Sequence, residues 1–177
     1  MPIASIFIRA SVRHLEDDYL PRIRDALALL APEDLWWRSE EHTNSVGNLL
    51  LHLQGNVRQW IVSGLGGATD ARDRASEFGR RGGEPFDPGE TDRLFATLSD
   101  TVHEACSVIE SMGEARLAVP VRIQGFDTTG LEAIYHVVEH FSWHVGQIVA
   151  FVKMRSARGA SLHFYDDARI NELRNER

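Results

Sequence analysis

Three histidines recur at every fourth position in the segment HVVEHFSWHVGQI, where they are His136, His140 and His144. On an α-helix, residues four apart are neighbours on one face, so the three imidazoles would stack along it. Neutral imidazole is the commonest metal-binding side chain, and two on adjacent turns can bind one ion. With 8 histidines in 177 residues, three in this register arise in roughly 2% of shuffled sequences. The spacing therefore calls for an explanation, and a metal site on a helix is the candidate.

A catalytic metal site with an open coordination position needs a third protein ligand, and His52 is the candidate. It is the only histidine inside the predicted second helix, and Asn48, Gln54 and Asn56 lie close to it in sequence. Three neutral nitrogens suit Zn²⁺ or Ni²⁺ better than Fe²⁺ or Mn²⁺. Taken alone, however, His52 would more often be a boundary histidine that is hydrogen-bonded to a neighbour. The remaining histidines are expected on the surface or in loops: His14, His42, His103 and His163.

The candidate ligands are expected on the flanks of their helices, beside the apolar stripes. His140 and His144 lie roughly 80–120° from the centre of one stripe, and His52 lies roughly 120° from the centre of another. His136 lies further round, toward solvent. A bundle opens into a cleft at such flanks, so a metal there would meet solvent, and Trp143 is a candidate wall for a pocket.

The composition is typical of a globular protein with one domain, which we expect to span residues 1–177 with a polar tail from about residue 155. The net charge of −7 argues against a nucleic-acid partner, because proteins that bind nucleic acids usually carry a basic face.

The single cysteine, Cys106, rules out an intramolecular disulfide and is expected to be a small buried hydrophobe. No apolar run is as long as a membrane span, and the first residues lack a signal-peptide layout. We therefore expect a cytoplasmic protein without a membrane partner.

Apolar residues recur with helical periodicity in four segments. Helices are predicted at about residues 3–30, 44–63, 88–112 and 129–154. Pro21 lies inside the first segment and should kink it or divide it in two. The second segment begins at Asn44 and Ser45, which are favourable N-cap residues, and the fourth begins at Thr128 or Thr129. The polar tail holds one further candidate, a short closing helix around Asp167–Asn175.

Two connections between these helices are informative. Residues 65–88 are rich in Gly, Arg and Asp and are too long for a tight turn. They can run the length of a bundle and join helices that point the same way, either as a lid over a site or only as a loop. The segment RLAVPVRIQGFDTTG is predicted to be a short extended piece or a hairpin, with Pro120 restricted to an edge. The sequence thus predicts an all-α fold, a four-helix bundle with a long crossover between helices 2 and 3 and a short extended segment before helix 4.

These features resemble the DinB/YfiT-like superfamily of metal-dependent helical bundles. The matching segments are DLWWRSEEHTNSVGNLLLHLQGNVRQWIVSG, VRIQGFDTTG and HVVEHFSWHVGQI. With the helix order they cover most of residues 3–154, and the chain looks most similar to a DinB-like branch of unknown function. The resemblance implies a bundle with a long crossover and a metal bound by His52, His140 and His144, with His136 outside the ligand set.

Further expectations come from the resemblance alone. The superfamily implies zinc or nickel and often forms homodimers. Its characterised members include transferases and isomerases that use low-molecular-weight thiols, such as mycothiol or bacillithiol, on small-molecule substrates. In some relatives a basic residue follows the last histidine, whereas this chain has Val145. That difference weakens the case for an anionic substrate at this position.

The leading hypothesis is a divalent-metal-dependent enzyme of the DinB type. Free coordination positions would bind water or a thiol, and the metal would lower the pKa of either ligand for hydrolysis or for transfer. Thiol-dependent transfer or isomerisation is preferred on the resemblance alone. The sequence offers no convincing general base, since Asn56 cannot titrate and Glu139 is expected to face away, and a thiolate needs less help from one. The alternatives are a non-catalytic, metal-stabilised bundle or stress-related protein, and an interaction module without metal.

Overall fold

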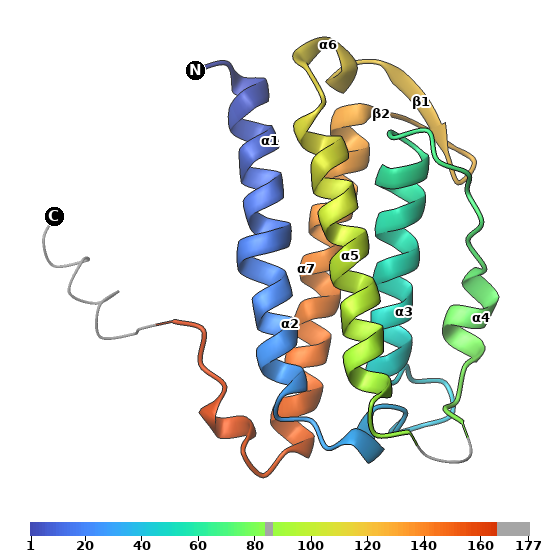
Figure 1. Ribbon diagram of the computed structural model, residues 1–177, viewed down its shortest axis with the longest axis vertical. Coiled ribbons are helices and arrows are strands. Elements are labelled where there is room, and N and C mark those ends of the chain that lie inside the picture. The colour runs from blue at the N-terminus through green and yellow to red at the C-terminus, as the bar shows by residue number, and fades with distance from the viewer. Residues whose placement is uncertain (84–86, 166–177) are drawn as a thin grey trace, which may run out of the picture.

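Four helical segments lie side by side and form a bundle in the computed structural model, which describes residues 1–83 and 87–165 (Figure 1). The first segment consists of α1 (Ile3–Arg13), a π-helical turn (His14–Tyr19) and α2 (Leu20–Leu27), and the second of α3 (Val46–Val57) and a π-helical turn (Arg58–Ser63). The third and fourth segments are α5 (Glu90–Glu110) and α7 (Gly130–Arg155). In Figure 1, α3 and α5 ascend whereas α1 and α7 descend. The predicted all-α four-helix bundle is thus confirmed, and its crossover joins two helices that point the same way.

Pro21 lies in the first turn of α2, directly after a π-helical turn. At that junction the backbone N–H of Leu20 donates to the carbonyl of Leu15, five residues earlier. Because proline has no N–H, it cannot continue the regular α-helical ladder, and the change of hydrogen-bond register accommodates it. The predicted break at Pro21 is therefore a change of helix type within one segment.

Capping boxes mark the beginnings of the two helices that carry the candidate ligands. The hydroxyl of Ser45 accepts from the N–H of Asn48 at 3.2 Å, and the Asn48 side-chain oxygen accepts from the N–H of Ser45 at 3.1 Å. Thr129 and Glu132 make the same reciprocal pair at the start of α7. Such pairs satisfy N–H groups that have no partner within the helix. The predicted starts are confirmed, and Thr129 is the cap in preference to Thr128.

The core lies between the four segments and holds α3 and α7 against each other. The packed pairs of helices include α3 with α5, α3 with α7, and α2 with α7. Each fully buried leucine or isoleucine contributes about 1.5–3 kcal/mol through the removal of apolar surface from water. The largest fully buried side chains include Leu15, Ile23, Leu50, Leu53, Ile61, Leu98, Ile109, Ile134, Phe141 and Ile148. This apolar packing fixes the relative position of the two helices on which the histidines lie.

The long crossover runs back along the outer side of α3 and contains a helix that was not predicted, α4 (Arg74–Gly79), which packs on α3 (Figure 1). The crossover is hydrogen-bonded to the body of the bundle. The side-chain amide of Asn48 donates to the carbonyl of Glu77 at 2.7 Å, and Arg38 donates to that of Phe78 at 3.2 Å. The described part of the crossover is therefore docked on α3.

A hairpin precedes α7. The sequence predicted either a short extended piece or a hairpin here, and the second alternative is confirmed. Its strands are β1 (Pro120–Ile123) and β2 (Phe126–Thr129), which pair antiparallel after a short unpredicted helix, α6 (Glu114–Leu117). Gln124 and Gly125 form the turn with φ of 54° and 84°, the left-handed conformation that a two-residue hairpin loop requires. The closing helix predicted around residues 167–175 lies outside the described residues.

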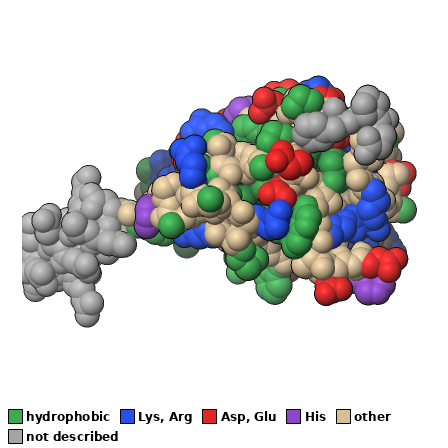
Figure 2. Space-filling model, turned by 90° about the horizontal axis from the view of Figure 1, so that it is seen from below, with side chains coloured by type: hydrophobic (Ala, Val, Ile, Leu, Met, Phe, Trp, Pro, Cys, Tyr) green, Lys and Arg blue, Asp and Glu red, His purple; other side chains and the backbone are tan. Residues whose placement is uncertain are grey.

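The surface mixes charges of both signs. Figure 2, which views the bundle from below, shows basic and acidic side chains interspersed over that end of the molecule. One ion pair joins the partly exposed Arg155 to the buried Asp34 at 2.6 Å. None of the helices within residues 1–83 and 87–165 combines the length and the apolar character that a membrane span requires.

Candidate metal centre

The three predicted histidines meet between α3 and α7. The Nε2 atom of His140 lies 3.0 Å from that of His52 and 3.2 Å from that of His144. One ring nitrogen from each of the three residues lies within 4.8 Å of the others. His140 and His144 are half-buried, whereas His52 is only 6% exposed. This cluster can hold a metal ion.

The outer nitrogens of two rings have partners that define which nitrogen carries the proton. His52 Nδ1 lies 2.9 Å from a carboxylate oxygen of Glu77, and His144 Nδ1 lies 2.7 Å from the side-chain oxygen of Gln147. Both oxygens only accept hydrogen bonds, so each Nδ1 carries the proton and each Nε2 presents a lone pair. Two lone pairs thus point toward Nε2 of His140.

The geometry of these nitrogens fits a divalent transition metal. Zinc–nitrogen bonds of about 2.0–2.1 Å in a tetrahedron place the nitrogens about 3.3 Å apart. The Nε2–Nε2 distances of 3.0 and 3.2 Å are close to that value. Converging lone pairs repel one another unless a cation or a proton lies between them. Three imidazole nitrogens from two helices are therefore a suitable donor set for the metal that the sequence predicted.

Burial keeps the histidines of α7 in the neutral form that binds metal. It lowers the pKa of His140 to about 3, and the neighbouring His144 and His52 add to the shift. Burial also lowers the pKa of His144, although the hydrogen bond to Gln147 opposes the change. The rings are thus uncharged at neutral pH, with their lone pairs available.

An ion pair from the crossover lies against His52 and was not predicted. Arg72 donates to both carboxylate oxygens of Glu77, at 2.7 and 2.8 Å, and the two side chains are only 4% and 8% exposed. Arg72 Nη2 also lies 3.1 Å from His52 Nδ1, but an ionised carboxylate can only accept, so Nδ1 donates its proton to Glu77 and has no lone pair for Arg72. Burial alone would raise the pKa of Glu77, but the hydrogen bonds from Arg72 and His52 outweigh burial and hold it below its usual value. Glu77 is therefore an ionised, buried acceptor.

One feature of the sequence could have signalled this pair. Gly55 is an isolated glycine inside a helical pattern, which often marks a close approach of another chain segment. A Cβ atom at Gly55 would lie 2.0 Å from a carboxylate oxygen of Glu77. Glu77 itself lies in a polar connection without periodicity, where no pattern distinguishes it from a solvated carboxylate.

His52 is buried although the periodicity predicted a flank beside a cleft. The crossover covers this side of α3, and the Phe78 ring packs on the imidazole with 4.7 Å between ring centroids. The periodicity of a helix describes only which of its own residues share a face. It therefore cannot show that a distant connection, here the crossover, buries a residue on that face. Trp143, the candidate pocket wall, is 65% exposed and borders a shallow depression whose lining does not include the three histidines.

His136 lies next to the cluster and is not one of its three members. It is half-buried, whereas the periodicity placed it toward solvent. Its ring packs on Trp60, with 4.2 Å between centroids, and its Nε2 lies 3.4 Å from the side-chain amide nitrogen of Asn56.

The other residues that were expected away from the site lie on the surface or near it. Glu139 is exposed, as its expected orientation away from the ligands implies. His14 is hydrogen-bonded to Asp18 at 2.7 Å. The surface or loop histidines His42, His103 and His163 are exposed.

Cys106 is a buried core residue, as predicted. It is 1% exposed, and burial raises the pKa of its thiol, with nearby carboxylates adding to the shift. A thiol in this state is a poor nucleophile.

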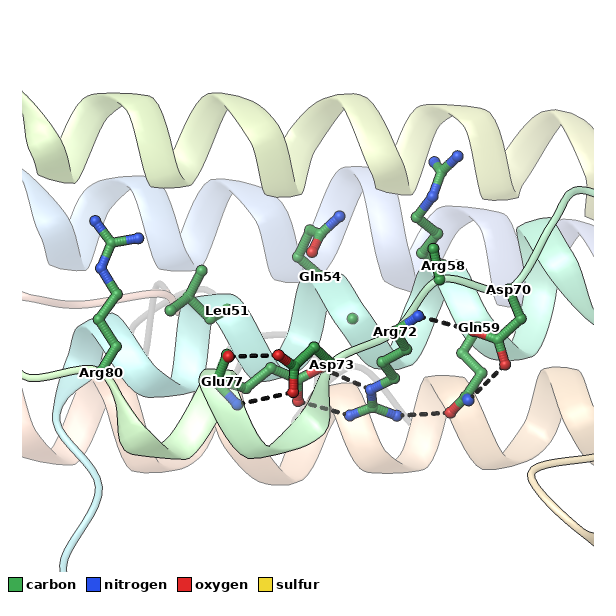
Figure 3. Close-up of a pocket in the computed structure, with 12 residues that line it drawn as sticks. Leu51, Gln54, Arg58, Gln59, Asp70, Arg72, Asp73, Glu77 and Arg80 are labelled. Carbon is green, nitrogen blue, oxygen red and sulfur yellow. Dashed lines mark hydrogen bonds and ion pairs between the residues drawn. The ribbon is translucent and has the colours of Figure 1, made fainter.

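A cavity of about 280 Å³, lined mainly by charged and polar residues, lies along the crossover side of α3. In Figure 3, Arg72 extends along α3 between Glu77 and Gln59, and Gln59 in turn contacts Asp70. The ion pair forms part of the wall of this cavity, whose lining includes no histidine of the cluster.

Comparisons with known proteins agree with the fold. A family model described as "Protein of unknown function (DUF1572)" matches residues 3–161. A solved structure, the crystal structure of a DinB-like protein from Bacillus cereus ATCC 10987, is similar with a TM-score of 0.60 and 13% sequence identity. The similarity covers 84% of this chain and 89% of that chain, and it shows a shared fold. No curated protein matches the chain in sequence.

Proposed function

The chain belongs to the DUF1572 family of proteins of unknown function and has a DinB-like fold, and from this premise we propose that it is a divalent-metal-dependent enzyme. His52, His140 and His144 are its metal ligands. The observation that supports this assignment is the convergence of three Nε2 atoms from two helices, with two outer nitrogens held by acceptors. Zinc or nickel is the proposed metal, because three neutral nitrogens suit both ions.

The proposed site leaves room for a ligand that does not come from the protein. The cluster found within residues 1–83 and 87–165 has three members, whereas closed structural zinc sites usually have four protein ligands. His140 and His144 are partly exposed, so a small molecule can reach their side of the site. A bound metal would supply Lewis acidity there and lower the pKa of a coordinated water or thiol.

A low-molecular-weight thiol is the proposed cosubstrate, in an S-transfer or isomerisation reaction on a small molecule. This choice follows the family resemblance, and the surroundings of the site are compatible with it. Both oxygens of Glu77 are engaged by Arg72 and His52, so this carboxylate is not free to act as a general base. Glu139 is exposed on α7, and Asn56 cannot titrate. Transfer of a metal-bound thiolate requires less help from such a base than activation of water does.

The alternative is a metal-stabilised bundle without catalysis, such as a stress-related interaction protein. The 6% exposure of His52 favours this alternative, because a metal there would tie α3 to α7 under the crossover. The coordination sphere distinguishes the two. An exchangeable water on the metal favours an enzyme, and a fourth protein ligand favours a structural role.

The first test is the metal content of protein purified without a polyhistidine tag, compared with the His52→Ala variant. The proposal expects about one zinc or nickel ion per chain in the wild type and its loss in the variant. A wild-type protein that contains no metal, even after reconstitution with either ion, would contradict the proposal.

We also propose, on the same resemblance, that the protein is a cytoplasmic homodimer. The buried state of its single cysteine is compatible with a reducing compartment. Exposed aromatic side chains on the outer side of α7, Tyr135 and Trp143, support self-association.

A further inference from the structure

We propose that Glu77, clamped by Arg72 and placed over Gly55, is a positioning residue that fixes the ring orientation and tautomer of His52. Docking of the crossover on α3 then completes the metal centre. This inference rests on the proposed function, in which His52 is a metal ligand.

The contacts of the three rings support a special role for Glu77. His144 is oriented by Gln147, which lies on the same helix. The Nδ1 atom of His140 has no hydrogen-bond partner among the residues that the structure describes. Of the three rings, only that of His52 is oriented by a residue from another element. This residue is Glu77, whose carboxylate oxygen lies 2.9 Å from His52 Nδ1. A carboxylate partner both fixes a ligating imidazole and makes it more basic, more strongly than a neutral amide does.

Glu77 is itself held in place, which a positioning residue requires. The planar guanidinium of Arg72 binds both of its oxygens, and a further Arg72 nitrogen donates at 2.9 Å to Gln59, in the π-helical turn that continues α3 (Figure 3). The backbone carbonyl of Glu77 accepts from Asn48, on α3. The carboxylate thus has few ways to move relative to the helix that carries His52.

Gly55 makes this arrangement sterically possible. It lies on α3, and a Cβ atom there would lie 2.0 Å from Glu77 Oε1, 2.9 Å from Glu77 Cδ and 3.0 Å from Arg72 Nε. Glycine is unfavourable inside a helix compared with alanine, so its use at a buried position needs a packing reason. The close approach of the ion pair is that reason. Gly55→Ala should therefore displace Glu77 without any change of charge or of a metal ligand.

Three variants test the inference: Glu77→Gln, Gly55→Ala and Gly146→Ala. Gly146 is the matched control, because it lies on α7 close to His144 and a Cβ atom there meets nothing within 4 Å. Zinc affinity is measured by competition with a chromophoric chelator. The tautomer of His52 is measured in the metal-free protein from the nitrogen resonances of its ring. Circular dichroism checks that each variant is folded.

Both Glu77→Gln and Gly55→Ala are expected to weaken zinc binding by about 10–100-fold and to reduce the population of the Nδ1-protonated tautomer of His52. Gly146→Ala should leave both properties unchanged. If Glu77→Gln does not fold, Gly55→Ala still tests the inference, because it keeps every charge.

The outcomes separate this inference from the proposed function. Zinc binding and a His52 tautomer that are the same in wild type, Glu77→Gln and Gly55→Ala would overturn the positioning role and leave the metal site intact. A wild-type protein that binds no zinc would overturn the proposed function. The tautomer measurement needs no metal, so in that case it would still show whether Glu77 orients His52.

Discussion

His140 lies between the other two histidines of the cluster, with its Nε2 near both of theirs. The rings of His52 and His144 also meet each other edge to face, with 5.0 Å between their centroids. His136, one turn earlier on the same helix, packs on Trp60 instead. The two positions therefore form a matched pair, in which the same substitution on the same helix has different consequences.

Replacing His140 with Ala is expected to abolish tight metal binding with only a modest loss of helix content. Alanine favours helix formation, and the removed ring lies at the edge of the bundle core. His136→Ala should leave metal stoichiometry nearly unchanged. Metal analysis and circular dichroism on both variants check this prediction. If His136→Ala removed the metal as completely as His140→Ala, the ligand pair on α7 would be wrongly assigned.

At the scale of the elements, α7 carries all three histidines whose pKa is lowered, namely His136, His140 and His144. Burial is the largest cause for each of them. In the unfolded chain these rings take up protons near the ordinary value of 6.5, whereas the folded state keeps them neutral to lower pH. The contribution of the neutral rings to stability is therefore complete above that value and is lost as pH falls toward the folded pKa.

The metal-free protein should accordingly become less stable as pH falls from about 7.5 to about 5.5. This window lies above the range in which the carboxylates titrate, so the histidines dominate the change. Urea unfolding midpoints across the window measure it. His140→Gln, which cannot be protonated, should show a shallower decline, and a flat profile in the wild type would contradict the prediction.

The crossover shows what helical periodicity can and cannot predict. The spacing of His140 and His144 places them on one face because helix geometry alone determines neighbours four residues apart. The contact between His52 and Glu77 depends instead on how a polar connection docks on α3, and its two partners are distant in sequence. The short helix α4 has too few residues for a recognisable apolar period.

At the scale of the whole molecule, exposed aromatic rings lie on the outer side of α7. Tyr135 is 63% exposed and Trp143 is 65% exposed, and both border a shallow depression beside Tyr19 and Val138. Large exposed apolar side chains that lie together are typical of surfaces that bind another protein. A second copy of the chain is the proposed partner.

Light scattering after size-exclusion chromatography should therefore report a dimer for the wild type. Trp143→Asp should shift it toward the monomer, because a carboxylate would be buried without a partner in the interface. Ile3→Asp, at an exposed apolar position at the start of α1, is the control and should remain dimeric. A monomeric wild type would refute the dimer.

Sequence reasoning alone predicted the four helical segments, the direction of the crossover and the three histidines that meet, and it placed the caps at Asn44 or Ser45 and at Thr128 or Thr129. These features follow from local geometry and from the length of a connection, which are properties of short stretches of chain. The folded structure selects Ser45 and Thr129 as the caps, and it shows that His52 is buried, that its partner is Glu77, and that Gly55 makes room for the ion pair. The contacts of Glu77 join segments that are distant in sequence, and the burial of a charged pair in a polar connection depends on packing that no local pattern encodes.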